Sequence, residues 1–144
     1  PYSSKGGGAV LLSVWDTTIV FVNCHLAAHM GAQFLARRNQ DYADIAGGIS
    51  LGDPHCGLLN QFHHCIWVGD VNYRLDMSEA FGEAATEMKA TQECHNHVET
   101  LIREDKYEEL LQTDQLLAAR RAGEAFVGFE EARIQHPPTF KVER

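Results

Sequence analysis

Short β-rich apolar runs alternate with an amphipathic helical stretch, and this alternation constrains the fold more than any other feature. The apolar runs at 8–15 and 19–23 flank a turn-forming triplet at 16–18, so they predict a β-hairpin. A compact apolar run at 64–68 predicts a buried strand, and apolar residues at helical spacing predict a helix over 33–49. Strands that alternate with helices indicate the α/β class, and the hairpin favours a mixed sheet over a parallel one.

After residue 78 the sequence becomes rich in Glu, Ala and Leu, which is typical of helices. We expect Ser78 to be the N-cap of the first helix in this half. Gly123 and Gly128 are expected to end the later helices. The helical segments that follow are predicted at 98–103, 106–111 and 114–121, with a loop at 51–62 and a short strand at 140–142.

The formal net charge of −8 argues against non-specific nucleic-acid binding, which needs a basic face. It does not exclude a polyanionic substrate, because a few converging cations or a divalent metal can supply local positive charge. No apolar run reaches the roughly 18 residues of a membrane span, and no signal-peptide pattern is present. Because the sequence begins with Pro1 and not with Met, we expect a processed or partial chain.

The cysteines form no CxxC pair, so we expect reduced thiols and not disulfides. They are Cys24, Cys56, Cys65 and Cys94. The histidines beside two of them, at 63–65 and 94–97, leave a zinc site as an alternative. Adjacent side chains rarely point at one metal, and no second ligand pair follows at the spacing of a zinc finger.

The segment WVGDVNYR at 67–74 carries the clearest chemistry, because a buried strand runs directly into an acid, an amide and a cation. Strand ends of α/β proteins are common places for a site. Asp70 suits proton abstraction from water, and Arg74 suits charge neutralisation. Asn72 suits a hydrogen bond to a phosphate oxygen or to a metal-bound water. The structural alternative is an Asx-type turn that ends the strand and has no chemical role.

Five ordered segments resemble the inositol polyphosphate 5-phosphatases of the endonuclease/exonuclease/phosphatase superfamily. WVGDVNYR is similar to the signature (F/W)xGDxN(F/Y)R of these phosphatases, whereas nucleases and sphingomyelinases of the superfamily usually keep only GDxN. The other segments, in order, are KGG at 5–7, FVNCHLAAH at 21–29, RRNQDY at 37–42 and PTFK at 138–141. DQL at 114–116, FEE at 129–131 and the ending FKVER at 140–144 resemble the branch that acts on phosphatidylinositol 3,4,5-trisphosphate.

The resemblance implies a DNase I-like fold, a four-layer α/β/β/α sandwich, for a partial catalytic domain over 1–144. It implies in-line hydrolysis of a 5-phosphate with Mg²⁺ polarising the phosphoryl group. Asp70 would orient or deprotonate the attacking water, and Asn72 would hold the scissile phosphate. His25 would contact that phosphate or assist the leaving oxygen, and Asn39 would support the site's hydrogen bonds.

The same resemblance implies a basic pocket on an acidic body. Lys141 and Arg144 would bind the neighbouring 4-phosphate, and Lys5 would lie near the inositol ring. The pocket would consist of Lys5, Arg38, Arg74, Lys141 and Arg144. Each of these cations also has a structural alternative as an ordinary solvated or helix-surface residue. The implied partners are a phosphoinositide or soluble inositol polyphosphate at a membrane surface, in the cytoplasm, with no nucleic acid and no integral membrane segment.

Two parts of the family's pattern are absent from this sequence. The magnesium-binding Glu precedes KGG in the family, and a second signature, P(A/S)WCDR, with a late Asp-His pair follows PTFK. We therefore expect a domain truncated at both ends, with open sheet edges and uncovered apolar faces. We expect the chain alone to be catalytically silent.

Two other functions remain open at this point. One is a nuclease or sphingomyelinase of the same superfamily, against which Tyr73, Arg74 and the PTFK segment count. The other is a non-catalytic module that binds phosphoinositide through the basic pocket without turning it over.

Overall fold

The computed structural model describes residues 4–82 and 92–139, which form two compact units. The first unit comprises 4–29 and 33–72, and the second comprises 30–32 together with the described residues from 73 onward. The predicted strand at 140–142 lies outside the described residues. No helix in the described part of the chain is long and apolar enough to cross a membrane.

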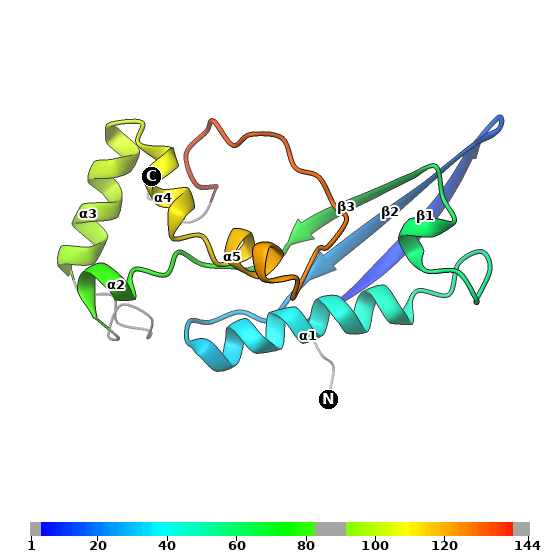
Figure 1. The fold of residues 1–144 in the computed structure, drawn as a ribbon, viewed down its shortest axis with the longest axis horizontal. Helices are drawn as coiled ribbons and strands as arrows, with labels where there is room; N and C mark the ends of the chain where they lie inside the picture. Colours follow the sequence, from blue (N-terminus) through cyan, green and yellow to red (C-terminus); the bar gives the residue numbers. More distant parts are fainter. Residues whose placement is uncertain (1–3, 83–91, 140–144) are drawn as a thin grey trace. The chain divides into compact units, whose positions relative to one another are not determined.

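The first unit is a three-stranded mixed sheet with one long helix (Figure 1). β1 (Gly6–Val14) pairs antiparallel with β2 (Thr17–His25), and β2 pairs parallel with β3 (His64–Asp70). The α/β class and the mixed sheet are therefore confirmed. The hairpin turn lies at residues 15–16 and not at 16–18, because the β-branched residues Thr17 and Thr18 continue into β2.

The helix α1 (Ala32–Gly48) covers one face of this sheet. Val20 and Val22 are fully buried on that face, and the ring of Tyr42 lies 5.1 Å from that of Trp67. A Cβ added at Gly7 would lie 2.7 Å from Ile45, so the glycine allows the helix to approach β1 closely. The predicted helix at 33–49 is thus confirmed to within a residue at each end.

The opposite face of the sheet is apolar and exposed in the described part of the chain. Val10 on β1 is 60% exposed, and Phe21 on β2 and Ile66 on β3 are 36% and 40% exposed. The strand register places these three side chains in one row across the sheet. A face of this kind is where the second sheet of a sandwich packs, which fits the expectation of uncovered core faces.

The second unit is helical. It contains α2 (Ser78–Phe81), α3 (Gln92–Arg103), α4 (Tyr107–Gln112) and α5 (Gln115–Ala122). The predicted helices at 98–103, 106–111 and 114–121 correspond to α3, α4 and α5, and the predicted loop at 51–62 contains one 3-10 turn at Leu58–Asn60. Buried Met77 and Cys94 form a small apolar cluster with Leu75, Phe81 and Val98 around them.

Two helix ends in this unit test the capping predictions. Gly123 has φ 74° and ends α5, as expected, with its N–H bonded to two carbonyls of the last turn. The prediction that Ser78 caps α2 is wrong, because Met77 occupies the N-cap position. The carboxylate of Asp76 instead accepts the N–H of Ser78, the first residue of α2, at 3.0 Å.

Gly69 provides a stability test of the β2–β3 pairing. Its φ is 119°, and a Cβ there would lie 2.1 Å from the carbonyl oxygen of Cys24. We predict that Gly69→Ala lowers the free energy of unfolding by at least about 2 kcal/mol, because it combines overpacking with backbone strain. Urea unfolding of the chain measures this. The control is Gly47→Ala, in α1 with open space around the new Cβ, which should be neutral or stabilising. Equal stability of the two variants would contradict the conclusion that the β2–β3 pairing requires glycine at position 69.

Candidate active site

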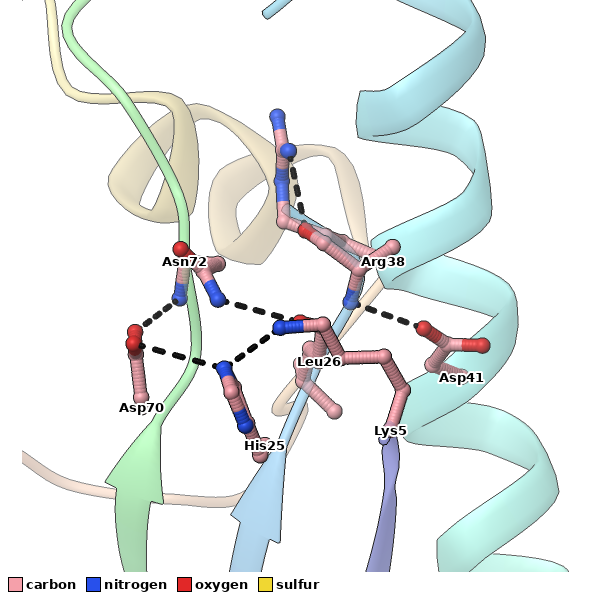
Figure 2. Close-up of polar contacts among 8 residues, drawn as sticks. Lys5, His25, Leu26, Arg38, Asp41, Asp70 and Asn72 are labelled. Atoms are coloured by element: carbon pink, nitrogen blue, oxygen red, sulfur yellow. Dashed lines mark hydrogen bonds and ion pairs between the residues drawn. The ribbon is translucent and has the colours of Figure 1, made fainter. Parts of the chain in front are cut away.

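The carboxyl ends of β2 and β3 meet at one edge of the sheet and bring two titratable side chains together. The parallel register pairs His25 with Asp70, and each is the last residue of its strand. Nε2 of His25 lies 3.7 Å from Oδ2 of Asp70, and both side chains are about half exposed, at 49% and 64%. Figure 2 shows His25 and Asp70 side by side at the ends of their strands. The arrangement leaves an acid and an imidazole accessible to a solute.

Lys5 reaches the same point from the residue before β1. Its Nζ lies 2.5 Å from Nε2 of His25. The ammonium group of Lys5 has only donors, so it can donate to this ring nitrogen. A cation, an imidazole and a carboxylate therefore converge from the ends of three strands, and together they can contact an anionic group and the water that attacks it.

The turn after β3 places Asn72 against β2. The Asn72 N–H donates to Oδ1 of Asp70 at 3.0 Å, and its side-chain Nδ2 donates to the Leu26 carbonyl at 3.0 Å. Its φ is 56°, in the left-handed region that Asn tolerates better than most residues. The Asx-type turn considered as the structural alternative is thus present, and it fixes Asp70 and Asn72 beside His25.

Helix α1 contributes two further polar side chains to this region. Arg38 is fully buried, and its Nη1 donates to the carbonyls of Ala27 at 3.3 Å and His29 at 2.9 Å. Asp41 is 8% exposed and accepts the Ala27 N–H at 2.9 Å. The expected contact of Arg38 with substrate stays a prediction, since the contacts of its Nη1 are to backbone oxygens of its own chain. Asn39 lies next to it on α1 and is half-buried, and its role also stays a prediction.

A cysteine close to the site is a packing residue and not a nucleophile. Cys24 is 4% exposed, and Nε1 of Trp67 donates to its sulfur at 3.1 Å. Burial raises the pKa of the Cys24 thiol, and the negative charge of Asp70 raises it further, against a smaller lowering by the Trp67 hydrogen bond. Because the thiolate is the reactive form, this environment argues against cysteine chemistry at the strand ends. All four cysteines are free thiols, as expected.

The described residues do not by themselves fit a magnesium centre. Among them, no three His, Cys, Asp or Glu side chains gather where they could hold a metal ion. Mg²⁺ prefers six oxygen ligands in octahedral geometry, whereas these strand ends present the carboxylate of Asp70 with His25 and Lys5 around it. No catalytic step through a metal is therefore derived from these residues. The same finding gives the zinc alternative no ligand cluster in residues 4–82 and 92–139.

Arg74 belongs to the second unit, where Gln115 bonds both its backbone N–H and its carbonyl. Its N–H donates to Oε1 of Gln115 at 3.1 Å, and its carbonyl accepts the Gln115 N–H at 3.0 Å. Gln115 is 8% exposed, and an isolated bridge joins Leu75 to Asp114 beside it. Lys141 and Arg144 lie outside the described residues, so their predicted roles are untested.

Asp41 and Gln115 are the residues that sequence reasoning missed. Both were present in the segments that carry the family resemblance, RRNQDY and DQL, but neither was assigned a role. The signal that could have found Asp41 is its spacing of three from Arg38, which puts the two on one face of a helix. No comparable local signal points to Gln115, whose partner is 41 residues away.

Asp114 is the N-cap of α5, and its carboxylate is partly buried. We therefore expect the stability of the chain to depend on pH through this group. The Asp114 carboxylate accepts the Leu117 N–H at 2.8 Å. Burial raises the pKa of Asp114, against lowering by the backbone N–H groups of Leu117 and Leu116 and by Arg121. Since the folded state holds the proton more tightly than the unfolded state does, stability falls as pH rises through the raised pKa.

We therefore predict that Asp114→Asn is as stable as the original chain or more stable at pH 7, because an amide oxygen keeps the cap without the charge. Asp114→Ala should lose about 1 kcal/mol of unfolding free energy through the lost cap. Relative to Asp114→Asn, the original chain should gain stability as pH falls toward 4. Urea unfolding at both pH values measures this, and a loss in Asp114→Asn as large as that in Asp114→Ala would contradict it.

The sequence pattern that defines Endonuclease/Exonuclease/phosphatase family 2 matches residues 1–144. Phosphatidylinositol 3,4,5-trisphosphate 5-phosphatase 2 of Sus scrofa is 38% identical over 98% of this chain and 10% of its own length. Phosphatidylinositol 3,4,5-trisphosphate 5-phosphatase 1 of Rattus norvegicus is 34% identical over 98% of this chain and 11% of its own length. The chain thus spans about a tenth of these relatives.

A solved structure shows the same fold. It is the inositol polyphosphate 5-phosphatase domain of SPsynaptojanin, in complex with inositol (1,4)-bisphosphate and calcium ion. The TM-score is 0.73 at 29% sequence identity, and the match covers 96% of this chain and 35% of the other. The resemblance inferred from five sequence segments is confirmed, and the arrangement of sheet and helices matches that of a larger phosphatase domain.

Proposed function

Because the chain belongs to endonuclease/exonuclease/phosphatase family 2, we propose that it is part of an enzyme that removes the 5-phosphate from inositol polyphosphates or phosphoinositides. The observation that carries the proposal is the convergence of Lys5, His25 and Asp70 at the ends of three strands. The relatives named as 5-phosphatases match this chain over nearly its whole length.

The residues at the strand ends have chemistry that suits phosphate ester hydrolysis. Asp70 is exposed and anionic, so it can orient a water molecule and take its proton as the water attacks phosphorus. Lys5 presents an ammonium group to the incoming phosphate, and His25 lies between that cation and the acid. Asn72 holds the turn that aims Asp70, and we assign it and Asn39 to the hydrogen bonding of the scissile phosphate.

The finer parts of the proposal concern the cofactor and the substrate. We propose dependence on Mg²⁺, with the principal ligands supplied from outside the described residues. Arg74, Lys141 and Arg144 are proposed to bind the phosphates that are not cleaved. The names of the relatives favour phosphatidylinositol 3,4,5-trisphosphate as substrate, which implies a protein that works in the cytoplasm at a membrane surface.

A second function for the chain itself is binding without turnover. The absence of a metal-holding cluster among the described residues favours it, because hydrolysis of a phosphate ester near neutral pH depends strongly on charge stabilisation. We expect the chain alone to release no phosphate from an inositol trisphosphate in the presence of Mg²⁺. Robust release by the purified chain would contradict this expectation.

The test of the enzyme proposal uses a longer protein that contains the chain together with the flanking sequence. We predict magnesium-dependent phosphate release from phosphatidylinositol 3,4,5-trisphosphate, reduced about 10²- to 10⁴-fold by Asp70→Asn. This substitution keeps an oxygen that can accept the Asn72 N–H, so the turn is preserved while the charge is lost.

Asp53→Asn is the matched control for this substitution. Asp53 accepts the N–H of His55 two residues on, at 2.8 Å, in the same kind of turn as Asp70 but in the loop before β3. It should keep full activity. Equal loss in both variants would attribute the effect to the turn and not to the site, and an inactive, folded longer protein would favour a binding module.

A further inference from the structure

Side chains, and not a neighbouring strand, make most of the hydrogen bonds to the backbone of the segment that follows β2. Residues 26–29 come directly after His25, beyond the last paired position of the sheet. Leu26 still makes one backbone contact, from its N–H to the Asp70 carbonyl at 2.9 Å. Its own carbonyl accepts the Asn72 side chain at 3.0 Å. From Ala27 onward the partners come from helix α1.

Arg38 and Asp41 together satisfy both backbone groups of Ala27. The carboxylate of Asp41 accepts its N–H at 2.9 Å, and the guanidinium of Arg38 donates to its carbonyl at 3.3 Å. The two side chains are three residues apart, on one face of α1, so they present an acceptor and a donor side by side as a strand does. Arg38 also donates to the His29 carbonyl at 2.9 Å, which extends the contact along the segment.

Arg38 and Asp41 are both buried, so they contact the protein's own backbone and not solvent. Arg38 has no exposed surface, and a buried cation is costly unless it is well bonded. Asp41 also pairs with Arg37 through Nε at 2.7 Å, which fixes the carboxylate from the solvent side. Figure 2 shows Arg38 and Asp41 on the helix side of the segment and His25, Asp70 and Lys5 at the strand ends.

We propose that Arg38 and Asp41 are positioning residues, which hold residues 26–29 and thereby aim His25 and Asn72 at the reacting phosphate. The catalytic part of this inference rests on the proposed function, whereas the positioning part concerns the chain alone. The pair acts through Ala27 and His29 and needs no contact of its own with substrate. This role differs from the direct phosphate contact expected for Arg38 on sequence grounds.

The first experiment measures positioning in the chain itself by nuclear magnetic resonance. Asp41→Leu removes the acceptor at similar size, whereas Asp41→Asn keeps an oxygen in its place. We expect Asp41→Leu to speed amide hydrogen exchange at Ala27 at least tenfold and to shift the His25 imidazole nitrogen resonances. Asp41→Asn should retain most of the protection and leave the His25 resonances near their original positions.

Asp44→Leu is the control for the loss of a carboxylate from α1. Asp44 is exposed on the same helix and accepts from Gln40 at 2.7 Å, away from residues 26–29. Asp44→Leu should change neither the exchange rate of the Ala27 amide nor the His25 imidazole resonances. If Asp41→Leu does not fold, Arg38→Lys replaces it, and a single ammonium should give a smaller effect of the same kind. Unchanged Ala27 exchange and His25 resonances in folded Asp41→Leu or Arg38→Lys would overturn the proposal.

The second experiment measures turnover in the longer protein that contains the chain. Arg38→Lys and Asp41→Leu are expected to lower kcat about 10- to 100-fold while KM changes less than about threefold, because a misaimed site still binds the phosphate groups. A rise in KM at unchanged kcat for Arg38→Lys would instead assign Arg38 to substrate binding and overturn its positioning role. If the unaltered longer protein has no activity, the proposed function fails, and the exchange and resonance measurements still decide the positioning.

Discussion

The parallel pairing of β2 with β3 is the constraint on which the site depends. It places the last residues of the two strands, His25 and Asp70, in register, and no local sequence signal could do so across 44 intervening positions. Gly69 permits the close approach, because any side chain there would collide with the backbone of Cys24. The turn after Asp70 then returns Asn72 to β2, where it bonds the Leu26 carbonyl. Lys5 needs only to precede β1 to reach the same edge.

Helix α1 links the apolar core to this polar edge. Its apolar side buries Val20 and Val22 and places Tyr42 against Trp67, while its Arg38 and Asp41 bond the chain after β2. One element therefore stabilises the sheet and orients the segment beside the site. The acidic net charge of −8 is compatible with this arrangement, because Lys5 brings one positive charge to a single point at the strand ends.

The α/β class, the hairpin, α1 and the helices of the second unit followed from periodicity, because these elements are set by local patterns. The hairpin turn was placed too late because Asp16, Thr17 and Thr18 were read as one turn, whereas β-branched residues favour the strand. The proposed roles of His25, Asp70 and Asn72 came from segments that resemble a family, because residue types alone favoured a plain Asx-type turn. The burial of Arg38 and the contacts of Asp41 and Gln115 were not predictable, because each depends on backbone groups brought near by the tertiary fold.

We propose that the ends of the three strands form the phosphate site. The most direct test is a titration of a longer, isotope-labelled protein that contains the chain. The ligands are inositol (1,4)-bisphosphate and calcium, which are bound in the solved structure of the similar domain. Backbone amide resonances are then followed by nuclear magnetic resonance. We expect the largest resonance shifts at Lys5, His25 and residues 70–72, and no shift of the Asp53 and His55 resonances. Saturable binding with shifts confined to other parts of the protein would contradict it.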